Sequence, residues 1–184
     1  MAEQVVIAPV VVALATAILT LLVRRGDRLR RGVSVAGVLA YAAAVGWLFA
    51  TVAAEGTLVY QVSDWAAPFG ITLVADPLAT FMLGLTALVA VPALVAAVRQ
   101  VGPQGQRVSF HPLYHFVMLG VTGSFLTGDV FNLFVWFEVM LMSSYVLVVF
   151  YGGPEHTRAG VRYVVLNLVA SAFMLVAIAN STGP

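Results

Sequence analysis

The sequence predicts an all-α integral membrane protein with six transmembrane helices and a small external β-hairpin or loop between the second and third helices. Hydrophobic residues make up 61% of its 184 residues and charged residues 9%, and the mean hydropathy is +1.00. Soluble domains carry roughly 25% charged residues, so this composition fits a bilayer as the solvent. The apolar residues fall into six runs, and all nine basic residues lie in alternate connections between them.

The six apolar runs predict the helices, because about 20 residues at roughly 1.5 Å per residue cross a hydrocarbon layer of ~30 Å. The fourth run is short for a span. In chain order the predicted helices cover Val5–Val23, Gly32–Ala54, Pro77–Val98, Pro112–Leu126, Val130–Phe150 and Val161–Asn180. Thr57–Trp65 and Phe69–Ala75 are β-prone and flank Ala66-Ala67-Pro68, which predicts the external hairpin; an irregular loop fits the same residues.

The positions of the charged residues predict the topology. The arginines lie in three connections, as Arg24, Arg25, Arg28, Arg30 and Arg31, then Arg99 and Arg107, then Arg158 and Arg162. The opposite segments carry no base, and their acids are Glu3, Glu55, Asp64, Asp76 and Asp129. The positive-inside rule therefore predicts a multi-pass protein of the cell membrane with both termini outside. The Arg24–Arg31 run is either a solvated loop that sets this topology or a site for anionic lipids.

Charge and cysteine content exclude several classes of function. A net charge of +1 gives no basis for nucleic-acid binding, so the lipid bilayer and other membrane subunits are the predicted partners. Without cysteine the chain has no disulfide, no thiolate metal site and no cysteine ligand for an iron–sulfur cluster, and we predict no cofactor.

A histidine pair is the one pattern that resembles a metal site. His111 and His115 have the four-residue spacing of two ligands on one helix face. Pro112 favours the first helical position, which places His111 outside the helix, and no third ligand is near. We therefore predict no metal site.

Glu138 is the candidate site residue, because it lies near the middle of the predicted helix Val130–Phe150. A carboxylate at that depth costs on the order of 3 kcal/mol, and intramembrane acids are functional by default, so we predict a site in an ion or proton path. Burial favours the protonated acid and a cationic partner favours the carboxylate, an opposition that a proton carrier can exploit. The alternative is a neutral acid that is hydrogen-bonded to a neighbouring helix.

Three further residues are predicted to assist this carboxylate. His115, about one turn into the fourth helix from the cytoplasmic side, is either a proton relay or a simply hydrogen-bonded histidine. Asn167 and Ser171 share one face of the sixth helix, and Ser171 lies at about the depth of Glu138. Both either hold water against the carboxylate or serve as polar contacts between helices.

The fourth and fifth helices are predicted to form a tight antiparallel pair. Small and hydroxyl residues, Thr122-Gly123-Ser124, occupy the end of the fourth helix and permit close approach, and only a few residues separate the two helices. Asp129 begins the fifth helix, where a carboxylate complements the helix dipole, and we predict that it is a helix cap and not an ion ligand.

Four stretches of the sequence resemble the D subunit of Mrp-type multisubunit sodium/proton antiporters, a family related to the antiporter-like subunits of respiratory complex I. They are Leu73–Pro77, Phe110–Tyr114, Leu126–Met140 and Arg162–Leu168. The run from Thr127-Gly128-Asp129 to Glu138 is the most specific of them. The resemblance covers essentially the whole chain and implies that Glu138 belongs to the proton path.

The resemblance also implies that the chain is the N-terminal part of a longer design. Family members contain two inverted repeats, and a lysine on a broken seventh helix partners the glutamate. This chain has six predicted spans and no lysine. We therefore expect one membrane domain, residues 1–184, with peripheral helices at about 5–98 and part of the first repeat at about 112–180.

The predicted function is that of a membrane subunit, whole or truncated, of a monovalent cation/proton antiporter, and not of an enzyme. Its expected partners are other subunits of the antiporter complex, and its expected ions are H⁺ and, as the candidate second ion, Na⁺. Two alternatives stay open at this point. One is a proton-pumping subunit of complex I or of a membrane-bound hydrogenase, and the other is an assembly fragment that transports nothing.

Overall fold

The computed structural model describes residues 3–23, 26–62, 70–100, 110–149 and 154–181, with side chains omitted at 100, 154–156 and 181. Its described part is built from one short 3₁₀-helix, six α-helices and one two-stranded sheet. The elements are η1 (Glu3–Val5), α1 (Ala8–Leu22), α2 (Asp27–Glu55), β1 (Leu58–Gln61), β2 (Thr72–Ala75), α3 (Pro77–Gln100), α5 (Phe110–Leu126), α6 (Val130–Val149) and α7 (Pro154–Ser181).

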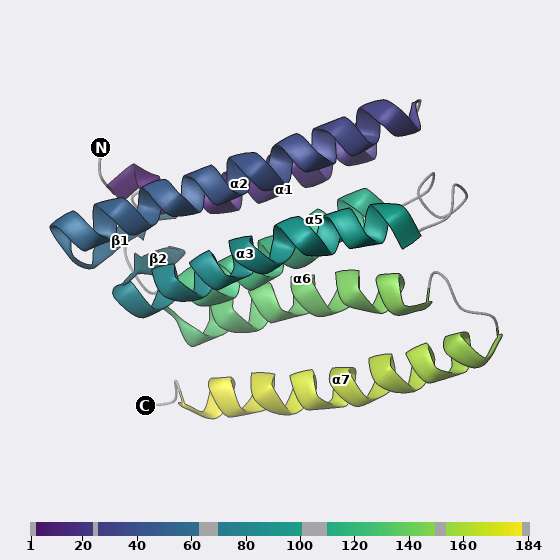
Figure 1. Cartoon of the computed structure of the whole chain (residues 1–184). Coiled ribbons are helices and arrows are strands. Elements are labelled where there is room, and N and C mark those ends of the chain that lie inside the picture. Colours follow the sequence, from purple (N-terminus) through teal and green to yellow (C-terminus); the bar gives the residue numbers. More distant parts are fainter. Residues whose placement is uncertain (1–2, 24–25, 63–69, 101–109, 150–153, 182–184) are drawn as a thin grey trace.

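The helices lie side by side and alternate in direction, with α1 and α2 at one edge of the bundle and α7 at the other (Figure 1). The first and last described residues and the sheet lie at one end of the bundle. The arginine-bearing ends of α2, α3 and α7 lie at the opposite end. The connections that carry the arginines in the sequence therefore lie at one end of the bundle, and the connections without a base lie at the other.

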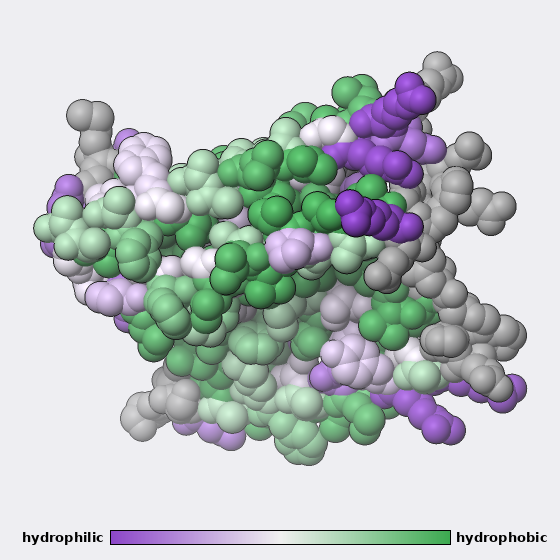
Figure 2. Space-filling model, viewed as in Figure 1, coloured by the Kyte–Doolittle hydropathy of each residue, from purple (hydrophilic) through white to green (hydrophobic). Residues whose placement is uncertain are grey.

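The face of the bundle shown in Figure 2 is apolar along most of its length. Leu88 on α3 and Leu166 and Phe173 on α7 are among the side chains that remain about 70% exposed. Among the described residues, five helical spans are long and apolar enough to cross a membrane, namely α1 taken together with η1, α2, α3, α6 and α7, so α5 is not one of them. With 17 residues, α5 is the shortest of the last four helices, as its sequence predicted.

Three helices, α2, α5 and α7, begin earlier than predicted. α2 begins at Asp27 and not at Gly32, so Arg28, Arg30 and Arg31 belong to a helix and not to a loop. Arginine is a good helix former, and Arg30 Nε donates a hydrogen bond of 2.9 Å to the Val23 carbonyl at the end of α1. Similarly, α7 begins at Pro154 and not at Val161, because proline suits the first helical position.

The start of α5 also corrects a prediction. The helix begins at Phe110, so His111 lies inside the helix and not outside it. Pro112 is the third helical residue, where its missing N–H removes no intrahelical hydrogen bond. Phe110 and His111 are both buried and their rings meet edge to face, with centroids 5.4 Å apart. Burial of these two rings extends the helix back beyond the proline.

The predicted hairpin between the second and third helices is confirmed. β1 and β2 pair antiparallel, with Leu58 opposite Ala75 and Gln61 opposite Thr72. The predicted turn at Ala66-Ala67-Pro68 lies outside the described residues. The sheet also reaches the α5–α6 connection, where the Gly128 N–H donates to the Thr72 carbonyl at 2.8 Å. The hairpin is therefore tied to the residues that precede α6.

The predicted tight pair of α5 and α6 is present, and glycine makes it possible. A Cβ added to Gly120 would lie 2.6 Å from the Met140 backbone nitrogen, and one added to Gly123 would lie 2.1 Å from the Trp136 ring. A larger residue at Gly120 would displace the α6 backbone at Met140, and one at Gly123 would displace the Trp136 ring. The two glycines thus set the distance between α5 and α6.

Replacing Gly120 by alanine is expected to destabilise the protein, because overpacking of a close contact costs about 1–3 kcal/mol. The measurement is the midpoint of thermal unfolding in detergent. Gly84→Ala on α3 is the control, since its added Cβ meets no atom within 4 Å. If both variants unfold at the wild-type midpoint, α5 and α6 do not approach as closely as described.

Candidate functional site

Glu138 lies near the middle of α6 and faces α7. It follows Val130, the first residue of α6, by eight positions, or ~12 Å of helix rise. Trp136 and Met140, two residues to either side, contact the glycines of α5. Two positions correspond to about 200° of rotation, so Glu138 is on the side of α6 that points away from α5. Its side chain is partly buried.

Ser171 is the described hydrogen-bond partner of Glu138. The Ser171 hydroxyl on α7 donates a short hydrogen bond to Oε1 of the carboxyl group. In the part of the chain that the structure describes, no basic side chain forms an ion pair with Glu138. A hydroxyl donor serves the carboxylate and can also accept from the protonated acid, so this contact allows either protonation state.

Asn167 lies one turn from Ser171 on the same face of α7 but is not described in contact with Glu138. Its Nδ2 donates to the Tyr163 carbonyl at 3.0 Å, within α7. Its side chain also interacts with the Tyr145 hydroxyl of α6. The sequence reasoning overlooked Tyr145. Its position, seven residues after Glu138 and therefore on the same helix face, was the available signal.

The structure does not bring His115 to Glu138. The His115 ring is fully buried, with Nε2 2.9 Å from the Ser34 hydroxyl of α2. Gly120 and Gly123 occupy the side of α5 that contacts α6, and Glu138 points to the far side of α6. His115 therefore belongs to a second polar interface, between α2 and α5.

The α2–α5 interface contains two hydrogen bonds between buried side chains. Beyond Ser34 and His115, the Tyr41 hydroxyl lies 2.8 Å from Oγ1 of Thr122, and each pair is seven residues from the other along both helices. Within the described residues, no group of three or more histidine and acidic side chains could hold a metal ion, His111 and His115 included. The ring nitrogens of His111 are buried without a described partner.

Asp129 lies at the start of α6 with the geometry of an N-cap. Its Oδ1 accepts a hydrogen bond of 2.8 Å from the backbone N–H of Asn132. Its Oδ2 accepts from the Asn132 side-chain amide. These contacts satisfy an otherwise unpaired amide at the helix start and leave the carboxylate bound to its own helix.

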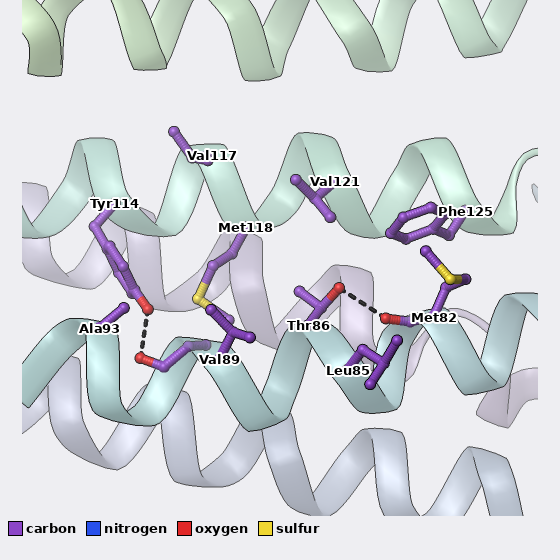
Figure 3. A pocket seen from close by; sticks show the side chains of 11 residues that line it. Met82, Leu85, Thr86, Val89, Ala93, Tyr114, Val117, Met118, Val121 and Phe125 are labelled. Carbon is purple, nitrogen blue, oxygen red and sulfur yellow. Dashed lines mark hydrogen bonds between the residues drawn. The ribbon is translucent and has the colours of Figure 1, made fainter.

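A cavity of about 400 Å³ lies between α3 and α5 (Figure 3). Its lining is apolar apart from two hydroxyl groups. Thr86 donates to the Met82 carbonyl at 2.9 Å, and Tyr114 donates to the Ala90 carbonyl at 2.6 Å. Because both hydroxyls already donate to the backbone, this cavity offers little to a proton or a cation. The α6–α7 interface is the better candidate site.

Comparison with known proteins identifies the family. Residues 127–181 match the family model described as NADH:quinone oxidoreductase/Mrp antiporter, TM. Over 96% of its length, the chain is 38% identical to the D subunit of the Na⁺/H⁺ antiporter of Alkalihalophilus pseudofirmus. The chain is a homologue of the Mrp antiporter D subunit. This D-subunit homologue spans 36% of that relative's length.

Solved structures agree with this assignment. A chain of the Mrp complex from Dietzia sp. DQ12-45-1b superposes on 97% of the D-subunit homologue with a TM-score of 0.83 and 30% identity, and 34% of that chain is covered. A chain of the archaeal membrane-bound sulfane sulfur reductase, a respiratory complex, superposes on 94% with a TM-score of 0.86 and 27% identity, and 36% of it is covered. The predicted resemblance is therefore confirmed, as a match to about a third of each relative.

A double-mutant cycle tests the hydrogen bond between α2 and α5. Tyr41→Phe and Thr122→Val each remove one hydroxyl, and we expect a coupling energy of about 0.6 kcal/mol, the average for side-chain hydrogen bonds between membrane helices. The free energy of unfolding of the wild type, both single variants and the double variant provides the cycle. Strictly additive effects would contradict a direct Tyr41–Thr122 bond.

Proposed function

We propose that the chain is a subunit of a multisubunit monovalent cation/proton antiporter in the cell membrane and that Glu138 carries protons within it. The observation that carries this proposal is the placement of Glu138 at mid-depth of α6, facing α7 and bonded to Ser171. An acid at that depth raises the free energy of membrane insertion, and intramembrane acids typically mark ion and proton pathways.

The chemistry of the site fits a proton carrier. Glu138 can hold a proton as the neutral acid and release it as the carboxylate, and Ser171 can hydrogen-bond to both forms. Asn167 and Ser171 form the polar lining on α7. In this proposal His115 does not relay protons to Glu138, because it contacts α2.

The similar proteins support the proposed setting. One relative is named as a component of an Na⁺/H⁺ antiporter and one similar structure is an Mrp complex, so we propose other antiporter subunits and lipid as partners. We further propose that α5 crosses the membrane with the five candidate spans, which makes six spans, and that both termini lie outside.

A redox-driven proton pump is the second candidate function. The observation in its favour is the similarity to a chain of a sulfane sulfur reductase complex. The proposed role of Glu138 is the same in both, and only the partner that supplies the energy differs.

Glu138→Gln is expected to abolish cation/proton exchange by the assembled complex, because an amide keeps the shape and much of the hydrogen bonding but releases no proton. Glu138→Asp should keep partial activity, since it retains a titrating group that is withdrawn by one methylene. Proton flux in inverted membrane vesicles, with the amount of assembled protein, is the measurement. Glu55→Gln, at the exposed end of α2, is the matched control. Normal exchange by Glu138→Gln would mean that the acid is structural.

Labelling of two introduced cysteines tests the topology. Thr57 and Thr157 are both exposed, at the sheet end and the arginine end of the bundle respectively, and the chain has no native cysteine. Thr57→Cys should react with an impermeant thiol reagent from outside the cell, and Thr157→Cys only after the membrane is opened. Reaction of both from the same side would refute the proposed topology.

A further inference from the structure

The contact between α6 and α7 contains a polar strip that extends beyond Glu138. Asn167 and Ser171 are four residues apart on one face of α7, opposite Glu138 and Tyr145 on α6. Tyr163, one turn further along α7, is exposed and lies outside the strip, where only its ring packs against Tyr145. Most of the other α7 side chains are exposed and apolar. The strip runs from the middle of the bundle toward the end that carries the arginines of α7.

Tyr145 is the central member of this strip. Its side chain is 7% exposed, and its ring meets the Tyr163 ring edge to face, with centroids 5.0 Å apart and an interplanar angle of 89°. Its hydroxyl interacts with the Asn167 side chain. Glu138 lies on the same face of α6, about two turns away. The ring is therefore held by packing while the hydroxyl faces polar groups.

The spacing of these groups forms a series along the helix axis. Tyr145 follows Glu138 by seven residues, which is ~10 Å of rise along α6, and Ser171 and Asn167 on α7 are ~6 Å apart. Ser171 donates a hydrogen bond to Glu138, and Asn167 lies one turn from Tyr163, whose ring packs against Tyr145. The two α7 side chains thus occupy the interval between the carboxyl group and the hydroxyl.

We propose that Tyr145 is a proton-relay residue between Glu138 and the arginine-bearing end of the bundle. The inference rests on the proposed function of Glu138. A phenol accepts a hydrogen bond through its oxygen while it donates through its O–H. Ser171 and water held by the Asn167 amide would connect Glu138 to the Tyr145 oxygen, since an amide does not itself carry a proton. A proton that arrives at the Tyr145 oxygen is matched by the loss of the original hydroxyl hydrogen on the other side, and the hydroxyl then rotates back before the next transfer. The same strip works in either direction.

The competing explanation is that Tyr145 only packs against Tyr163, since aromatic pairs stabilise interfaces by themselves. Tyr145→Phe separates the two roles, because it keeps the ring contact and removes only the hydroxyl. Tyr163→Phe is the matched control, because it makes the same change in the other ring of the pair.

The experiment measures cation/proton exchange by the assembled complex in vesicles between pH 6 and pH 9, together with the amount of assembled protein. For Tyr145→Phe we expect normal assembly, an exchange rate roughly tenfold lower and an altered pH profile. Loss of a sole acid–base group lowers a rate by about a hundredfold or more, but water can replace a relay residue in part, so the expected loss is smaller. Tyr163→Phe should retain the wild-type rate and profile.

Three outcomes would overturn the relay, and they differ from a failure of the proposed function. A wild-type rate and pH profile for Tyr145→Phe, with Glu138→Gln inactive, refutes the relay and leaves the function of Glu138 intact. Equal losses of assembled protein in both tyrosine variants, with normal exchange per assembled complex, reduce Tyr145 to packing. Normal exchange by Glu138→Gln refutes the proposed function and the relay together.

Discussion

The glycine contact between α5 and α6 is the constraint on which the position of the carboxyl group depends. Because Gly120 and Gly123 have no side chains, the backbone of α5 comes into contact with Met140 and Trp136 of α6. Glu138 lies between these two residues in the sequence and half a turn from them on the helix. The contact that joins the two helices therefore also directs the acid away from the closely packed core, toward α7.

The bundle contains two polar interfaces with different properties. Between α2 and α5, Ser34 with His115 and Tyr41 with Thr122 form buried pairs, which is how polar side chains join helices in a bilayer. Between α6 and α7, the acid is only partly buried and its described partner is a single hydroxyl. The first interface is suited to fixing the helices, and the second holds the acid to which we assign the proposed proton transfer.

The sheet and the cap fix the end of α6 that lies farthest from the arginines. Thr72 of the hairpin accepts a hydrogen bond from Gly128, and Asp129 binds the first turn of α6 through Asn132. Glu138 follows this anchored start by about two and a half turns. The contacts at the start of α6 therefore fix the depth of Glu138 in the bundle, and the two glycines of α5 fix the direction in which it points.

The sequence by itself determined the membrane class, the six helices, the tight α5–α6 pair and the family, because these follow from composition, periodicity and local motifs. It left a hairpin and an irregular loop open between α2 and α3, and the strand pairing of the structure decided for the hairpin. It also placed Glu138 and Ser171 at one depth, since depth is a count of residues along a helix. Only the tertiary structure decided which helix face meets which neighbour: it directed His115 to α2, brought Tyr145 to Asn167 and extended α5 to include His111. When every face of a helix is apolar, its sequence carries little information about how the helix is rotated about its own axis. Local contacts, such as those of Gly120 and Gly123 with α6, then decide which face meets which neighbour.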